Sequence, residues 1–156
     1  MRIKSRLIIA ITILLLPLLW LLWGNAQGAT STHTAPDGRY SFDMPENWAD
    51  ESTADFNAFS YSENIYTYLL AVEANDVDSG IRQALDITVP ELDSEPVKTT
   101  TAPAPNGTWT QKIYTLPDVS MVVAVGQVVD DVAYVLILQA PDETALQTVS
   151  DDFTNI

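Results

Sequence analysis

Apolar and polar residues alternate in several segments after residue 36, and this period of two predicts β-strands. In the first segment, 39–44, Tyr40, Phe42 and Met44 alternate with polar residues until Pro45 ends the pattern. Turn residues separate the segments, beginning with Asp37-Gly38. The other predicted strands are 56–62, 65–73, 109–116, 120–129 and 132–139. Together they predict an antiparallel sheet of five to six strands.

Two further segments have helical spacing. The first runs over about 76–89, where Asn75 or Asp76 can cap a helix that carries apolar residues at Val77, Ile81, Ala84 and Leu85. The second follows Pro141 and places Leu146, Val149, Phe153 and Ile156 on one stripe. Strands 120–129 and 132–139 are apolar on both faces, so both faces need a cover. We therefore predict an α+β fold with two helices, layered as an α/β/α sandwich around one core.

Four prolines punctuate the chain after the first helix, at positions 90, 96, 103 and 105. Because proline lacks a backbone N–H, we expect 90–105 to be an extended connection that neither continues the helix nor pairs inside a sheet.

The N-terminus has the pattern of a targeting or anchoring segment. Arg2, Lys4 and Arg6 precede an uncharged apolar run at 7–23, and small residues follow it. We predict a signal peptide or membrane anchor over 1–24, with the domain outside the cytoplasm of a bacterial-type cell. If the segment is not cleaved, the protein is held in the membrane through 7–23; if it is cleaved, the protein is secreted. A flexible linker is predicted over 25–36, and the domain over 37–156.

Charge narrows the choice of partner. Of 156 residues, 47% are hydrophobic and 18% charged, which suits one domain with its own core. After residue 24 the chain has four basic and 21 acidic residues, a net charge of −17. Such a surface repels nucleic acid and acidic lipid, so a neutral or cationic partner is expected, unless the charge serves only solubility. Cysteine is absent, which excludes disulfides, thiolate nucleophiles and a lipoprotein anchor.

The segment from Asp37 to Trp48, Asp-Gly-Arg-Tyr-Ser-Phe-Asp-Met-Pro-Glu-Asn-Trp, resembles the opening of PsbP-like and Mog1-like domains. The resemblance covers about 37–156 and implies a compact α/β/α sandwich that serves as a binding or accessory module. The chain is also similar to an accessory domain that precedes β-lactamase-like serine hydrolase domains in some exported bacterial proteins. It contains no Ser-x-x-Lys or Gly-x-Ser-x-Gly motif, so the resemblance supplies no catalytic residue. Tyr40, Phe42 and Trp48 are interpreted as packing residues.

Candidate chemistry in the sequence is sparse. His33, the one histidine, falls in the predicted linker, where we interpret it as a solvated residue. Acidic pairs occur at 76/78, 130/131 and 151/152, but their spacing does not match a calcium loop. A carboxylate pair acting on a glycosidic bond has no support beyond the number of acidic residues. Asn106-Gly107-Thr108 matches a glycosylation acceptor and is interpreted as a turn. We assign no catalytic, cofactor-binding or metal-binding residue, and no cofactor.

The sequence thus favours a non-enzymatic accessory module outside the cytoplasm that binds an envelope protein. We expect the contact in the region Thr99 to Trp109, or in the carboxylates of the turns. An alternative is a domain that binds a small ligand or calcium, for which the first residues to test are Asp76, Asp78, Asp130 and Asp131. A third hypothesis is a detached accessory domain of a serine hydrolase system.

Overall fold

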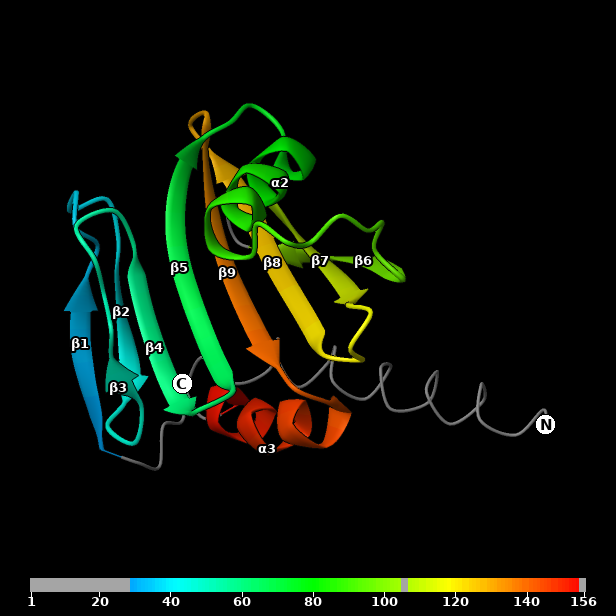
Figure 1. Ribbon diagram of the computed structural model, residues 1–156. Helices are drawn as coiled ribbons and strands as arrows, with labels where there is room; N and C mark the ends of the chain where they lie inside the picture. Colours follow the sequence, from blue (N-terminus) through cyan, green and yellow to red (C-terminus); the bar gives the residue numbers. More distant parts are fainter. Residues whose placement is uncertain (1–28, 105–106, 155–156) are drawn as a thin grey trace.

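A computed structural model gives the structure of the protein and describes residues 29–104 and 107–154 (Figure 1). Two helices and nine strands form this part of the chain. The helices are α2 (Val77–Thr88) and α3 (Glu143–Thr154). The strands are β1 (Thr30–Thr34), β2 (Ser41–Pro45), β3 (Ala49–Asp50), β4 (Asn57–Ser62), β5 (Ile65–Glu73), β6 (Lys98–Ala104), β7 (Gly107–Thr115), β8 (Met121–Val129) and β9 (Val132–Ala140).

Seven of the strands form one antiparallel sheet in the order β3-β4-β5-β9-β8-β7-β6, and β1 and β2 form a separate two-stranded sheet. The predicted strands all appear, so the α+β fold class is confirmed, although the main sheet has seven strands instead of five to six. The central junction joins distant segments, because Leu69 in β5 pairs with Leu136 in β9. At the β8–β9 turn, Asp130 and Asp131 have φ angles of 52° and 59°, as a two-residue type I′ hairpin turn requires.

The prediction that 90–105 cannot pair in the sheet is wrong. Lys98–Ala104 forms β6, which pairs with β7 from Lys98 opposite Ile113 to Ala104 opposite Gly107. The prolines of this segment allow pairing because β6 lies at the edge of the sheet, where only one side of the strand needs ladder hydrogen bonds. Pro103 therefore excludes a central position in the sheet and is compatible with pairing at its edge.

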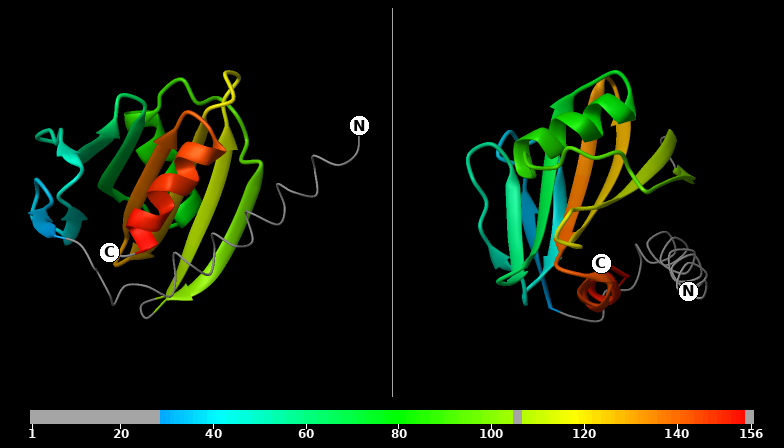
Figure 2. Two further views of the ribbon diagram at one scale, coloured as in Figure 1. Left: turned by 90° about the horizontal axis from the view of Figure 1, so that it is seen from below. Right: turned by 45° about the vertical axis from the view of Figure 1, so that its right-hand side comes forward.

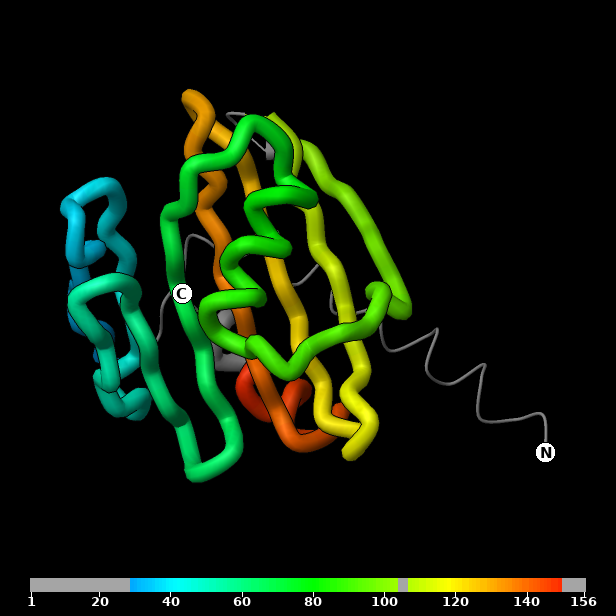
Figure 3. The backbone as a smooth tube through the Cα atoms, turned by 45° about the horizontal axis from the view of Figure 1, so that its top comes forward, coloured from blue at the N-terminus to red at the C-terminus, as the bar shows by residue number. Residues whose placement is uncertain are grey.

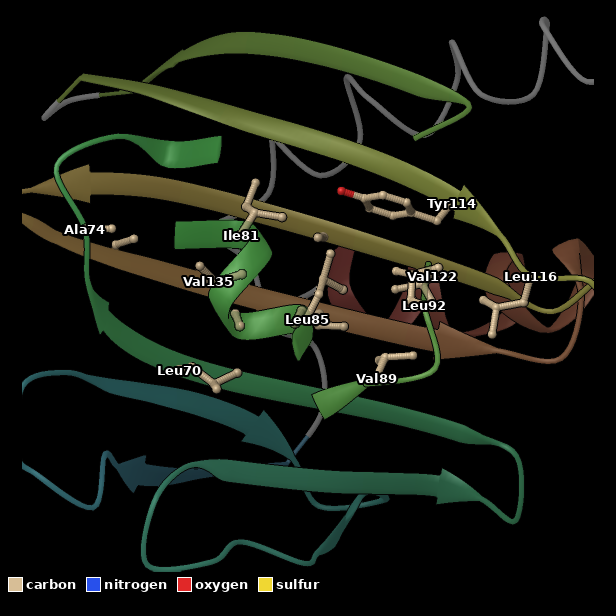
Figure 4. Close-up of a cluster of buried hydrophobic side chains, with 14 residues drawn as sticks. Leu70, Ala74, Ile81, Leu85, Val89, Leu92, Tyr114, Leu116, Val122 and Val135 are labelled. Atoms are coloured by element: carbon tan, nitrogen blue, oxygen red, sulfur yellow. The ribbon is translucent and has the colours of Figure 1, made fainter. Parts of the chain in front are cut away.

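Helix α2 covers one face of the sheet, which we call the α2 face (Figure 4). Asp76 caps the helix, since its side chain accepts a hydrogen bond of 2.8 Å from the Ser79 backbone N–H. The helix packs very closely on β8 and β9: a Cβ built on Gly80 would lie 2.2 Å from the Cβ of Ala133. The buried cluster on this face includes Ile81, Leu85, Leu92, Tyr114, Val122 and Ile137.

Helix α3 lies on the opposite face, which we call the α3 face (Figure 2). Asp142 precedes the helix and caps it, since its side chain accepts a 2.8 Å hydrogen bond from the Ala145 backbone N–H. Beside it, the β1–β2 sheet contributes Met44 to the same buried cluster. Other members of the cluster are Trp48, Phe59, Ile65, Ile113, Val123, Leu138, Leu146 and Val149. With helices on both faces of the sheet, the predicted α/β/α sandwich is confirmed.

The predicted flexible linker over 25–36 is wrong for the residues of it that the structure describes. Thr30–Thr34 forms β1, which pairs with β2 from Thr30 opposite Pro45 to Thr34 opposite Ser41. The segment is polar and has no apolar alternation, so its sequence did not predict a strand. Backbone pairing with β2 and the ring contacts of His33 hold the strand in place.

The predicted signal peptide or anchor over 1–24 lies outside the described residues. Within 29–104 and 107–154, no helix combines the length and the apolar character needed to cross a membrane.

Candidate protein-binding surface

The sequence suggested the region from Thr99 to Trp109 as a contact, and the described residues of this region lie in β6 and β7, at the edge of the main sheet (Figures 1 and 3). β6 is the last strand in the order, so β7 is its one strand neighbour in the described part of the chain. Its other side therefore presents backbone groups that are not used in the ladder.

Pro103 indicates which backbone groups these are. Proline has no N–H, so its nitrogen occupies a position that faces away from β7. Because the orientation of successive residues alternates along a strand, Thr101 and Thr99 face the same way as Pro103. The outer edge of β6 thus presents the N–H and C=O groups of Thr99 and Thr101 and the C=O of Pro103. Thr100 faces β7, and its hydroxyl lies 3.4 Å from the side-chain oxygen of Gln111.

The hairpin is the one large part of the domain that has no acidic residue. The sequence contains no carboxylate between Glu95 and Asp118, and β6 and β7 together carry two of the four basic residues that follow residue 24. Acidic residues border the hairpin at one end, because the start of β6 pairs with the end of β7. The edge is therefore a neutral to weakly basic strip within a strongly acidic domain.

Most of the domain's basic side chains are engaged within the domain. Arg39 contacts Asp37 and Glu73, at 3.1 and 2.7 Å. Arg82 contacts Asp86 at 2.6 Å, and Lys112 of β7 contacts Asp78 of α2 at 2.8 Å. These cations pair with carboxylates of the domain itself, and the remaining acidic residues carry its net charge of −17.

Three polar side chains near this edge are buried, which the pattern of the sequence did not predict. Thr110, Gln111 and Gln127 are each 6–7% exposed. Gln111 and Gln127 lie on the α3 face, as does the half-buried Trp109, and the Gln127 amide nitrogen has no hydrogen-bond partner among the described residues. Gln127 stands within the apolar run 121–129, whereas Thr110 and Gln111 stand in 107–115, where most residues are polar. A polar residue at an inward position of the apolar run was the available sign of Gln127.

The structure gives the predicted acidic candidates structural roles. Asp76 caps α2, and Asp78 binds Lys112 from the first turn of the helix. Asp130 and Asp131 form the β8–β9 turn, and the Asp131 carbonyl accepts a 3.0 Å hydrogen bond from the Ala74 backbone N–H. The described residues contain no group of three histidine or acidic side chains that could hold a metal ion. The side chains of the 151/152 pair, and the turn at Asn106, lie outside the part described.

His33 is not a solvated linker residue, so that prediction is wrong. It lies in β1, with its ring 4.7 Å from that of Phe59 and 5.7 Å from that of Phe42. Its Nδ1 is 3.5 Å from a carboxylate oxygen of Asp50, and its Nε2 is 2.9 Å from the Ser31 hydroxyl. The prediction fails because it depends on an unfolded linker; within a strand, the ring has aromatic neighbours to pack on.

The aromatic residues of the Asp37–Trp48 segment are packing residues. Trp48 is 5% exposed, and Phe42 stacks edge-on against Phe59. The single O–H of Tyr40 lies 2.7 Å from the Leu69 carbonyl oxygen, to which it donates, and 3.1 Å from the Asn57 side-chain oxygen, which shares the same proton. Burial, with a smaller contribution from Asp37, raises the pKa of Tyr40 well above its ordinary value. Tyr40 thus joins the start of β2 to β4 and β5.

The comparisons with known proteins concern the fold. No protein-family model matches the sequence, and no curated protein matches it. The fold is that of the PsbP/Mog1-like domains, as the resemblance of the Asp37–Trp48 segment implied.

Two solved structures carry this assignment. One is the solution structure of cyanobacterial PsbP (CyanoP) from Synechocystis sp. PCC 6803, with a TM-score of 0.55 and 13% identity over 84% of this chain and 89% of that chain. The other is the crystal structure of the Ran-binding protein Mog1p from Saccharomyces cerevisiae, with a TM-score of 0.54 and 9% identity over 81% of this chain and 85% of that chain. At these identities the similarity defines the fold alone.

Proposed function

We propose that the protein is a non-enzymatic accessory module that binds a protein partner outside the cytoplasm. The observation that carries the proposal is the β6–β7 hairpin: a sheet edge without carboxylates, unpaired among the described residues, in a domain with a net charge of −17. The fold supports it, because Mog1p, which has the same fold, is a Ran-binding protein.

The proposed location rests on the sequence. The basic residues before the apolar run at 7–23 are typical of a segment that enters a membrane and leaves the following domain on the far side. An envelope protein or another exported protein is therefore the proposed partner, and the acidic surface favours one with neutral or basic contact regions.

Affinity capture tests the proposal. The full-length protein, tagged after Ile156, is crosslinked in native membranes and purified, and the recovered proteins are compared with those from a chain in which 30–156 is replaced by an unrelated acidic domain. We expect one stoichiometric exported protein that depends on 30–156. Recovery of the same proteins with both chains would refute a binding role for the domain.

A further inference from the structure

We propose that the outer edge of β6 binds an extended segment of the partner protein as an additional, eighth strand of the sheet. The inference rests on the proposed function and identifies the binding surface and the chemistry of the bound segment. Thr99 and Thr101 each present an N–H and a C=O, and Pro103 presents a C=O, so the edge can form up to five backbone hydrogen bonds with an added strand.

Other free strand edges of the described chain are less suited to this role. β3 is only two residues long and includes Asp50. The β1 edge has carboxylates beside it, because Asp43 of β2 accepts a 2.6 Å hydrogen bond from the Thr32 hydroxyl and Asp50 lies close to His33. β6 is seven residues long, and neither it nor its neighbour β7 contains a carboxylate. Of these edges, β6 is the one where pairing with an added strand requires the least desolvation of charged groups.

Nearby carboxylates determine which charge one end of the bound segment should carry. The start of β6 follows Glu91, Asp93 and Glu95, and the end of β7 beside it leads to Asp118. A strand that lies along β6 leaves the hairpin at this acidic end. We infer a segment with an uncharged core and with lysine or arginine at the end that passes these carboxylates.

The neighbouring side chains define the core of the segment. On the α3 face of the sheet, an added strand places its side chains beside Thr100 and Ala102, which are half-buried, with Trp109 one strand further in. Cross-strand neighbours of this kind favour β-branched and aromatic side chains. A second copy of the chain fits less well, because pairing β6 with its own copy brings together two domains that each carry a net charge of −17.

A random library of displayed 12-residue peptides tests the inference and does not require that the partner be identified. The library is selected on the full-length protein in nonionic detergent. We expect enriched peptides with a β-branched or aromatic core and with lysine or arginine at one end, and weaker binding at higher salt.

Two matched variants locate the binding. Thr101→Pro removes the outward N–H, whereas Thr101→Val keeps it along with a β-branched side chain. We expect about tenfold weaker peptide binding to Thr101→Pro and unchanged binding to Thr101→Val. Thr99→Pro applies the same test at the next outward position, and near-UV circular dichroism verifies that each variant is folded.

Several results would overturn the inference: no enrichment, enriched peptides that bind both proline variants as tightly as the wild type, or acidic enriched peptides. A dimer in sedimentation that Thr101→Pro dissociates would also overturn it, because β6 would then pair with its own copy. The failure of the inference is distinct from that of the proposed function. A partner captured from membranes equally by wild type and Thr101→Pro would bind elsewhere on the domain, whereas the absence of any partner specific to 30–156 would refute the function itself.

Discussion

Replacing Gly80 by alanine tests how closely α2 packs on the sheet. The Cβ that this substitution adds would lie 2.2 Å from the Cβ of Ala133, whereas ordinary contact begins at 3.4 Å. The contact is too short by 1.2 Å, and the obstacle is a short side chain on the central strand β9 that has no rotamer through which to move. The helix must therefore shift away from the sheet.

Two opposing effects set the size of the change. Alanine is more favourable than glycine inside a helix by up to about 1 kcal/mol. Against this, a shift of about 1 Å loosens the contacts of Ile81, Ala84 and Leu85, which are fully buried, and overpacking of this kind costs about 1–3 kcal/mol or more. Because the overlap is large and buried, we expect the loss to exceed the gain, with a net destabilisation of about 2 kcal/mol and a Tm lower by about 5–10 °C.

Thermal and urea unfolding of the full-length protein in detergent, followed by near-UV circular dichroism, measures the effect. The control is a double-mutant cycle with Ala133→Gly, which removes the overlapping methyl group and leaves the next contact of the new Cβ at 3.5 Å. In that background, Gly80→Ala should cost at least about 1 kcal/mol less. If Gly80→Ala is as stable as the wild type, or if Ala133→Gly does not reduce its cost, the reasoning from close helix–sheet packing is wrong.

Three further predictions concern a cap, a buried hydroxyl and the free edge. Asp76→Ala should lower the free energy of unfolding by about 1 kcal/mol because α2 loses its N-cap, and Asp76→Asn should restore most of it; equal losses in both variants would contradict the capping role. Tyr40→Phe should cost about 1–3 kcal/mol at pH 7, because it removes the one proton that the Leu69 carbonyl and the Asn57 side-chain oxygen share. Because the pKa of Tyr40 is raised in the folded state, the stability that its neutral hydroxyl contributes is complete below pH 10 and is lost as the pH rises further. In urea unfolding at a series of pH values, the wild type should therefore lose stability above pH 10 more steeply than Tyr40→Phe. Parallel profiles of the two proteins would argue against this. Thr101→Pro should change the midpoint of thermal unfolding little, whereas Thr100→Pro, whose N–H faces β7, should cost about 1–3 kcal/mol; the reverse order would mean that the edge is oriented the other way.

The sequence predicted the strands that have apolar side chains and missed those that depend on backbone pairing. In β8 and β9 the apolar residues on both faces indicated a buried strand, and the structure confirms it. In β1, Thr-Ser-Thr-His-Thr carries no apolar residue, so nothing in the pattern indicated that it pairs with β2. β6 was excluded by its prolines, because periodicity does not tell an edge strand from a central one.

The conformation of the expected contact region was not predicted from the sequence. Thr99 to Trp109 was expected to be a linker region, whereas its described residues pair as β6 and β7 at a sheet edge. The absence of carboxylates in this stretch was visible in the sequence. Its significance depends on the order of the strands, in which β5 pairs with β9, far along the chain, and β6 is the last strand. Pairing at such separations is a property of the folded chain and cannot be read from local patterns.

The position of β9 between β5 and β8 also determines when the domain can fold as it is synthesised. Until residues 132–140 are available, β3-β4-β5 and β8-β7-β6 are two separate sheets, each with an open edge where the central strand belongs. Neither half can bury its side of α2, because that helix packs on β5, β8 and β9 together. We therefore expect the chain to remain unfolded until its last quarter has emerged, and to fold then in one cooperative step.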